Sequence, residues 1–162
     1  MKDAANSNRY RSAARSHDPA NMAYLESTLG YRIKLGLVAL YREIYESLGD
    51  TDLTLVQFSV LCIALDNPGI AQSEIASALG VERPRLVPII DSLEQRDLAE
   101  RRPNPIDRRS RMIFLTPKGE TCVKSLKKNF DAHQAQLRSR MGGDKFDSLM
   151  DALDWIVKNT QK

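Results

Sequence analysis

The sequence predicts a mainly α-helical protein that carries one short two-stranded β-hairpin. Apolar residues recur at steps of three and four along most of the 162-residue chain, the period of amphipathic helices. One stretch departs from that period, where Pro103-Asn104-Pro105 separates two segments able to pair as strands, Leu98–Arg102 and Met112–Leu115. Five arginines crowd around this turn: Arg101, Arg102, Arg108, Arg109 and Arg111. A packed core would have to give each arginine a partner, so we expect the hairpin to project from the surface.

Composition and charge exclude several classes of protein. With 42% hydrophobic and 28% charged residues, the chain is ordinary for a globular protein, so general disorder is not expected. No apolar run approaches the ~18 residues of a membrane helix, and the first residues lack the apolar core of a signal peptide. Cys62 and Cys122 lie far apart, and His17 and His133 have no clustered partner, so we expect a reduced, cytoplasmic protein without a metal site or membrane partner. The net charge of +3 alone does not indicate nucleic-acid binding.

The pattern divides the chain into four parts. Residues 1–20 are polar and mixed, which predicts a flexible N-terminal tail, with a functional arm as the alternative. Residues 21–50 hold one long amphipathic helix, and residues 117–162 hold two more. The apolar stripes of these helices need a partner, which a second copy of the chain or packing within one chain would supply. We expect dimerisation helices in both segments and a separate folded head in residues 51–116.

Capping residues set the helix boundaries in the third part. Thr54 and Gln57 form a capping box, and Asn67-Pro68-Gly69 closes the helix that it opens. A short helix over roughly 72–79 turns at Gly80-Val81 into the next helix. The inward residues of that helix are predicted to be Leu86, Ile89, Ile90 and Leu93. Two short helices joined by a glycine-containing turn and followed directly by a basic hairpin predict a winged helix-turn-helix with a two-stranded wing.

Two more signals concern the C-terminal helices. Thr116 and Pro117 start the first of them, with a hydroxyl cap followed by proline at the first helical position. Gly142-Gly143 ends that helix, and Asp144 is expected to cap the last one.

Five motifs follow one another along the chain: Gln57–Leu61, Gln72–Val81, Ile90–Leu98, Asp107–Arg111 and Leu115–Gly119. The last two, Asp-Arg-Arg-Ser-Arg and Leu-Thr-Pro-Lys-Gly, are the most specific in this order. With them, the run from Leu29 to about Phe130 resembles the MarR family of bacterial transcriptional regulators. The resemblance implies a homodimer that binds a pseudopalindromic operator, usually as a repressor. Many members of that family release DNA on binding a small aromatic molecule or an oxidant.

Candidate DNA contacts lie on the two short helices. Arg83 and Arg85 occupy the first turn of the recognition helix, and Pro88 lies on its outer side. An arginine contact to guanine in the major groove contributes about 1–3 kcal/mol of discrimination. Gln72 and Ser73 open the preceding helix, where the helix dipole favours a phosphate. Solvated surface side chains are the alternative for each of these residues.

The wing supplies the other candidates. Arg108, Arg109 and Arg111 can lie on the phosphate backbone and reach a minor groove. By the resemblance, one of Arg108 and Arg109 supports the wing and the other enters the minor groove. Asp107 is expected to be structural, accepting from Arg108, Arg109 or a backbone group, because a carboxylate facing phosphates would be repelled.

The chain departs from the family pattern at several positions. The recognition helix usually carries Ser or Thr where Arg85 and Val87 stand, which favours readout by arginine. Pro88 removes a helical hydrogen bond, so we expect a kinked or locally widened helix. Asp97 stands where the family commonly has glycine, and aspartate can adopt the same left-handed conformation. Ala71 replaces the usual hydroxyl cap, which forfeits about 1 kcal/mol of local stability.

Four residues fall in the region that matches the family's ligand pocket: Tyr31, Arg32, Tyr41 and Phe58. Cys62 and His133 are less favoured candidates for the same region. An arginine among aromatic rings suits an aromatic carboxylate or a related acyl thioester, although ordinary core and surface positions are the alternative. Cys62 is the first cysteine of the chain and lies in an apolar run, which predicts a structural thiol rather than a peroxide sensor.

The sequence carries no phosphate-binding glycine loop, no nucleophile–base pair and no paired metal ligands, so we expect neither an enzyme nor a cofactor. The residues favour a sequence-specific DNA-binding regulator, a repressor released by a small aromatic acid or its acyl thioester. The alternative is a non-catalytic dimeric module for protein interaction or architectural DNA binding.

Overall fold

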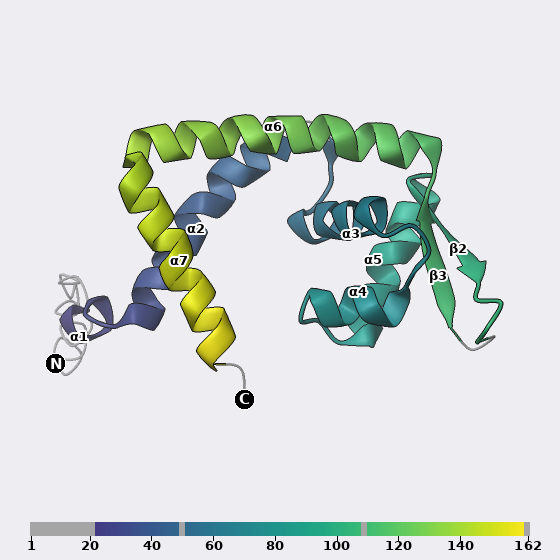
Figure 1. Ribbon diagram of the computed structural model, residues 1–162, viewed down its shortest axis with the longest axis horizontal. Coiled ribbons are helices and arrows are strands. Elements are labelled where there is room, and N and C mark those ends of the chain that lie inside the picture. The colour runs from purple at the N-terminus through teal and green to yellow at the C-terminus, as the bar shows by residue number, and fades with distance from the viewer. Residues whose placement is uncertain (1–21, 49–50, 108–109, 161–162) are drawn as a thin grey trace, which may run out of the picture. The chain divides into compact units, whose positions relative to one another are not determined.

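The computed structural model describes residues 22–48, 51–107 and 110–160. These residues form two compact units with a boundary between Ala39 and Leu40. The first unit holds α1 (Ala23–Glu26) and the first part of α2 (Leu29–Leu48), and the second holds the rest of α2 and all later elements (Figure 1). The expected tail over residues 1–20 lies outside the described residues.

The remaining elements follow in chain order: α3 (Leu55–Asp66), β1 (Ile70–Ala71), α4 (Gln72–Ala78), α5 (Arg83–Gln95), β2 (Ala99–Pro103), β3 (Arg111–Leu115), α6 (Pro117–Met141) and α7 (Gly143–Thr160). The pair α4 and α5 forms the helix-turn-helix, and the hairpin β2–β3 forms the wing beside α5. The predicted mainly helical, winged helix-turn-helix fold is therefore confirmed. None of the helices described here is long and apolar enough to cross a membrane.

The sheet is antiparallel and has the order β1-β3-β2. In the wing, Ala99 pairs with Leu115 at one end and Pro103 with Arg111 at the other. The sequence predicted these two strands within one residue at each end, but it did not predict β1, whose Ile70 pairs with Ile113 of β3. A strand of two residues is too short to show the alternation by which strands are recognised.

The hydrophobic core of the second unit lies among α3, α4, α5, the sheet and the first turns of α6. Its fully buried side chains include Leu61, Ile75, Leu86, Ile90, Leu93, Ile113 and Val123. Each such side chain stabilises the fold by about 1.5–3 kcal/mol relative to an exposed position. The inward face predicted for the recognition helix is confirmed, because three of these residues belong to α5 and Ile89 lies at the edge of the core.

The start of α3 carries the predicted capping box. Thr54 Oγ1 accepts the Gln57 N–H at 3.2 Å, and Gln57 Oε1 accepts the Thr54 N–H at 2.8 Å. The buried Gln57 side chain also donates to Ser92 Oγ at 3.0 Å, which connects α3 to the recognition helix. At α4, Ala71 provides no side-chain cap, as expected, but the Glu74 carboxylate accepts the Ala71 N–H at 2.9 Å.

The turn after α5 confirms the left-handed conformation expected at Asp97, whose φ is 57°. The Leu98 N–H donates to the Leu93 carbonyl at 2.9 Å, and the Asp97 N–H donates to the Glu94 carbonyl at 2.9 Å. This pair of bonds is a Schellman motif, which satisfies carbonyl groups at the end of the helix and directs the chain into β2.

The start of α6 rests on the same turn. Thr116 Oγ1 accepts the Gly119 N–H at 3.0 Å and donates to the Asp97 carbonyl at 2.7 Å. A side chain on Gly119 would overlap the carbonyl oxygen of Leu98, so the backbones approach closely only because residue 119 is glycine. The Leu-Thr-Pro-Lys-Gly motif therefore fixes α6 against the end of the recognition helix.

Two local expectations have different outcomes. Helix α7 begins at Gly143, so Asp144 lies inside its first turn and is not the cap that the sequence suggested. A carboxylate there still interacts favourably with the helix dipole. Helix α5 runs without a break from Arg83 through Pro88 to Gln95. A bend of its axis at Pro88 stays a prediction.

Candidate nucleic-acid interface

Several predicted site residues line one hollow of about 370 Å³ on the second unit. Its lining consists of Gln72, Ser73, Arg83, Val87, Asp107, Ser110 and Arg111. The first two residues begin α4, Arg83 and Val87 come from α5, and the last three belong to the wing. The fold thus brings together three segments that are separate in the sequence. Two arginines at a helix N-terminus and a wing suit an anionic group such as a DNA phosphate.

The outer face of α5 is open to solvent. Arg83, Arg85 and Pro88 are exposed, and Val87 is 42% exposed, whereas Leu86 and Ile90 are fully buried. Arg85 lies outside the hollow, on the exposed first turn of α5. The recognition helix therefore presents arginines from its first turn, the part that meets base edges when such a helix enters a major groove.

The wing arginines differ in their surroundings. Arg101 is only 19% exposed and lies against Asp91 and Glu94 of α5, so this arginine of the projecting hairpin is directed toward the recognition helix. Arg102 is 55% exposed, pairs with Glu100 and lies with its guanidinium carbon 4.3 Å from the centre of the Phe114 ring. Arg111 is exposed and lines the hollow. Arg108 and Arg109 lie outside the described residues.

The wing tip is held by hydrogen bonds among Asn104, Ile106, Asp107 and Ser110. Asn104 Oδ1 accepts the N–H groups of Ile106 and Asp107 at 2.9 and 3.3 Å, and Asn104 Nδ2 donates to Ser110 Oγ at 2.9 Å. The Asp107 carbonyl accepts the Ser110 N–H at 3.0 Å. The backbone of Asp107 is thus part of the turn. That its side chain accepts from Arg108, Arg109 or a backbone group stays a prediction. Ile106 is 94% exposed at this tip.

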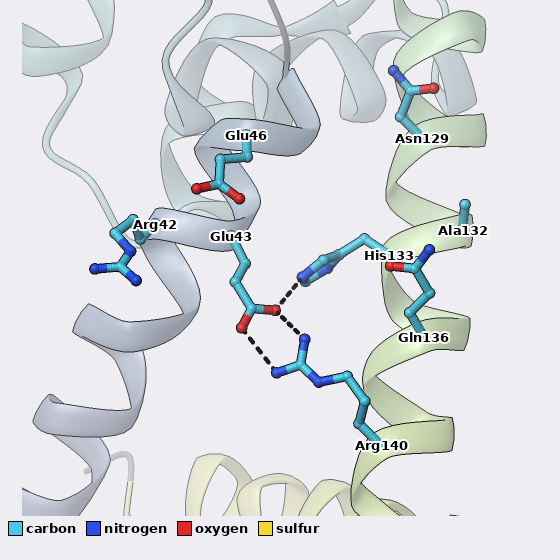
Figure 2. A pocket seen from close by; sticks show the side chains of 8 residues that line it. All are labelled: Arg42, Glu43, Glu46, Asn129, Ala132, His133, Gln136 and Arg140. Carbon is cyan, nitrogen blue, oxygen red and sulfur yellow. Dashed lines mark hydrogen bonds and ion pairs between the residues drawn. The ribbon is translucent and has the colours of Figure 1, made fainter.

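A second hollow of about 550 Å³ lies between the last turns of α2 and the second half of α6. Its lining is Arg42, Glu43, Glu46, Asn129, Ala132, His133, Gln136 and Arg140. We call it the polar pocket. Figure 2 shows Glu43 pointing from α2 toward His133 and Arg140 on α6.

Glu43 is the centre of the polar pocket. Arg140 Nη1 and Nη2 donate to the two Glu43 carboxylate oxygens at 3.1 and 3.0 Å, and His133 Nε2 lies 3.0 Å from Glu43 Oε2. The hydrogen bond from Arg140, followed by that from His133, lowers the pKa of Glu43 from 4.5 to about 2. These contacts join the end of α2 to α6 through an ionised carboxylate.

The four residues predicted for a ligand pocket fall in different places. Tyr31 and Arg32 belong to the first unit, whereas Tyr41 and Phe58 belong to the second. The Phe58 side chain is 7% exposed and stacks on Phe130 with ring centres 4.4 Å apart. As far as the structure describes it, the lining of the polar pocket includes none of the four.

The thiol of Cys62 is partly buried, and this burial raises its pKa. A raised pKa lowers the thiolate fraction at neutral pH, in agreement with the structural role predicted for this residue. Within the described ranges, no group of three or more His, Cys, Asp or Glu side chains is placed to hold a metal ion.

Comparisons with known proteins show relatives that share this fold. The sequence signature of the MarR family matches residues 53–110. The structure of the transcriptional repressor CouR bound to a 23-mer DNA duplex is 36% identical to this chain, with a TM-score of 0.80, and the match covers 84% of this chain and 96% of CouR. The chain belongs to the MarR family. A second structure shows the repressor CouR bound to p-coumaroyl-CoA, with 33% sequence identity to this MarR-family chain and a TM-score of 0.80. The match covers 86% of this chain and 99% of that CouR chain.

Two curated relatives are named as transcriptional regulators, which agrees with this assignment. A regulatory protein for the hcr operon of Thauera aromatica is 28% identical over 114 residues, which are 68% of this chain and 69% of that protein. The transcriptional regulator HosA of Escherichia coli O111:H- is 28% identical over 99 residues, or 61% of this chain and 73% of HosA. The resemblance drawn from the Asp-Arg-Arg and Leu-Thr-Pro-Lys-Gly motifs is confirmed, and this chain is a MarR-family transcriptional regulator with a winged helix.

Around the candidate sites of this MarR-family chain, sequence reasoning missed two features. The contacts of Arg101 with α5 were not predicted, because five clustered arginines look alike until the strands are paired. The polar pocket was also missed, although His133, Gln136 and Arg140 recur at steps of three and four along α6. That spacing places three polar side chains on one helix face and was the available signal.

Proposed function

We propose that this MarR-family regulator is a homodimeric, sequence-specific repressor whose DNA-binding surface is formed jointly by α4, α5 and the wing. The observation that carries the proposal is the hollow in which Arg83 of the recognition helix and Arg111 of the wing lie beside the start of α4. The structure of CouR, a repressor bound to a DNA duplex, supports it. The relatives named above are transcriptional regulators, which agrees with a role outside catalysis.

Each part of this surface has a proposed role. Arg83 and Arg85 read base edges in the major groove, where arginine pairs with guanine. Gln72 and Ser73 donate to a phosphate at the start of α4, and Arg111 adds a cationic contact from the wing. By the family pattern, one of Arg108 and Arg109 supports the wing and the other enters the minor groove.

Two copies of the chain place two such surfaces on one pseudopalindromic operator. The terminal helices expose large apolar side chains, including Ile33, Leu37, Tyr41 and Tyr45 on α2 and Leu149, Met150, Trp155 and Val157 on α7. Apolar surface of this extent marks an interaction site, and a second copy would cover it. Repression requires only that the bound dimer occupies a promoter.

A small aromatic acid or its acyl thioester is the proposed effector. The support is the CouR structure bound to p-coumaroyl-CoA, together with Arg32 among Tyr31, Tyr41 and Phe58 in the sequence region of the family pocket. Such a ligand lowers operator affinity if it binds the DNA-free conformation more tightly, and coupling of this kind is typically ~1–3 kcal/mol.

The DNA-binding part is tested by selecting sites from a random DNA library and measuring anisotropy with selected and scrambled duplexes at about 50 and 200 mM salt. The proposal expects a strong preference for the selected site and a steep salt dependence. Steep salt dependence without sequence preference would indicate an architectural DNA-binding module instead. No binding to either duplex would indicate a protein-interaction module.

The effector is tested separately, by thermal shift with phenolic acids and their coenzyme A thioesters. Free coenzyme A and aliphatic acids are the controls. A compound that raises the melting temperature should also release the labelled duplex. If no aromatic compound raises the melting temperature, or if those that do leave DNA bound, the effector class is wrong while the DNA-binding proposal stands.

A further inference from the structure

Arg101 has contacts unlike those of the other described wing arginines. Its Nη1 lies 2.5 Å from Asp91 Oδ1 and 2.5 Å from Glu94 Oε2, and its Nη2 donates to the Val87 carbonyl at 3.1 Å. The Arg101 backbone N–H also donates to Glu94 Oε1 at 2.7 Å. One residue of β2 therefore makes four hydrogen bonds to the recognition helix.

The three acceptors are arranged as one stripe on α5. Val87, Asp91 and Glu94 follow at steps of four and three, so they share one helix face. The planar guanidinium with its five N–H donors fits several acceptors at once, which a lysine ammonium does not match. With two carboxylates and a carbonyl within reach, this guanidinium is engaged by protein rather than being presented to a phosphate.

The stripe reaches the proposed DNA-binding surface. Val87, whose carbonyl Arg101 contacts, also lines the hollow together with Arg83 and Arg111. The contact thus fixes β2 of the wing to the recognition helix at Val87, a residue that lines that hollow. A shift of the wing against α5 would separate the two arginines that are proposed to meet one DNA duplex.

We propose that Arg101 is a positioning residue that holds the wing at a fixed orientation to the recognition helix, through Asp91 and Glu94, and does not itself contact DNA. The inference rests on the proposed function, because it explains how the recognition helix and the wing of the proposed DNA-binding surface are held in a fixed relative position. Its partners Asp91 and Glu94 are then required for tight operator binding even though they are acidic.

The acidic partners make the test decisive. If Asp91 and Glu94 act only through their charge, removing a carboxylate raises the affinity for DNA, whereas if they act by holding Arg101, it lowers the affinity for the selected duplex. Loss of a carboxylate near a phosphate backbone strengthens binding if charge alone matters. If Glu94 acts by holding Arg101, Glu94→Gln and Asp91→Asn weaken binding to the selected duplex, by about tenfold, comparable to one mismatched base pair. Binding to the scrambled duplex changes little or becomes tighter.

Arg101→Gln should weaken operator binding to a similar degree without changing the slope of log affinity against log salt. Removal of one phosphate-binding cation would reduce that slope by about 0.9, or about 1.8 for the two copies in a dimer. Arg102→Gln is the matched control, since it removes the same charge from the same strand without a described contact to α5. Its ratio of selected to scrambled affinity should stay within about twofold of wild type.

A double variant completes the experiment. If Arg101 acts through Glu94, Arg101→Gln/Glu94→Gln loses no more affinity than either single variant, whereas independent roles would give additive losses. Additive losses, tighter operator binding by Glu94→Gln, or a reduced salt slope for Arg101→Gln would each overturn the inference. If Arg101→Gln does not fold, as judged by circular dichroism, the two acidic variants decide alone.

These measurements distinguish failure of the proposed DNA-binding function from failure of the positioning role of Arg101. A wild-type protein without preference for any selected duplex removes both the proposed function and this inference. A wild-type protein that prefers its selected duplex, combined with an overturning result among the variants, removes only the positioning role of Arg101.

Discussion

Asp97 holds a left-handed backbone, with φ at 57°, at the turn that leads from the recognition helix into the wing. Its N–H and that of Leu98 complete the Schellman motif, and its carbonyl accepts Thr116 Oγ1 of the next helix. This conformation costs energy for any residue with a Cβ and little for glycine. Asp97 therefore adopts a left-handed conformation that glycine would adopt at lower cost in free energy.

Asp97→Gly is expected to raise the free energy of unfolding by about 0.5–1 kcal/mol, because the strain of a left-handed side chain is relieved. Asp97→Ala keeps the Cβ without the tolerance of aspartate for this conformation and should lower it. Urea unfolding followed by circular dichroism measures both. A glycine variant no more stable than the alanine variant would show that the turn is not strained.

The residue scale also shows where sequence reasoning stops. Thr54, Asp97 and Gly142 were assigned correctly because caps and turns depend on near neighbours in the chain. Arg101 was grouped with the exposed arginines because its three acceptors lie 7 to 14 residues away, on a helix whose pairing with β2 no local pattern specifies. Charge clustering predicts a cationic segment, but only tertiary contacts separate a DNA contact from a protein contact.

At the scale of elements, the junction between α5, β2 and α6 depends on the close approach of Gly119 to Leu98. Gly119→Ala would force the start of α6 away from this turn, with an expected loss of about 1–3 kcal/mol in unfolding free energy. Glu120→Ala, one residue further, removes an exposed pair with Lys124 and a carboxylate from the first turn of α6, and should lower the unfolding free energy by less than about 1 kcal/mol. Equal effects of the two substitutions in thermal unfolding would contradict the close approach.

The connection between α2 and α6 is expected to depend on pH through Glu43. Its folded pKa is about 2, below the ordinary 4.5, so its contribution to stability is fully present above pH 4.5 and is lost as the pH falls toward 2. Glu43→Gln should therefore lose less stability than wild type over this window. The measurement is the urea midpoint at several pH values, with Glu46→Gln as a control from the same pocket.

A Glu43→Gln variant that loses stability in parallel with wild type between pH 4.5 and pH 2 would assign the acid sensitivity to other carboxylates. Asp147, whose pKa is lowered by its hydrogen bond with Arg138, is the other described carboxyl group with a lowered pKa. The urea midpoints of Arg138→Gln over the same pH range would then measure how much of the acid-induced loss of stability comes from Asp147.

At the scale of the whole molecule, the terminal helices leave large apolar side chains exposed in one chain, and Trp155 is 63% exposed. If a second copy covers this surface, Trp155→Glu places a charge in the interface and should yield a monomer. Lys124→Glu changes charge on α6, where the lysine side chain is 61% exposed and pairs with Glu120, so the dimer should persist. Light scattering after size exclusion measures the mass, and a Trp155→Glu dimer would place the interface elsewhere.

The winged head and the amphipathic terminal helices were predictable because periodicity, caps and turn residues all indicated the same elements. The polar pocket and the third strand were not, since each joins segments far apart in the chain. The same limit applies to the effector: Tyr31, Arg32, Tyr41 and Phe58 were grouped by family pattern, and their joint role stays a prediction.

The central claim is that one surface, formed by the recognition helix and the wing, reads a specific DNA sequence. The most direct measurement is the affinity of wild type, Arg85→Ala, Arg108→Ala and Arg109→Ala for selected and scrambled duplexes. We expect Arg85→Ala to reduce the ratio of the two affinities, by about 1–3 kcal/mol for removal of an arginine–guanine pair, while the wing variants weaken both duplexes and leave the dimer intact. Wing variants that bind both duplexes as tightly as wild type would contradict the account.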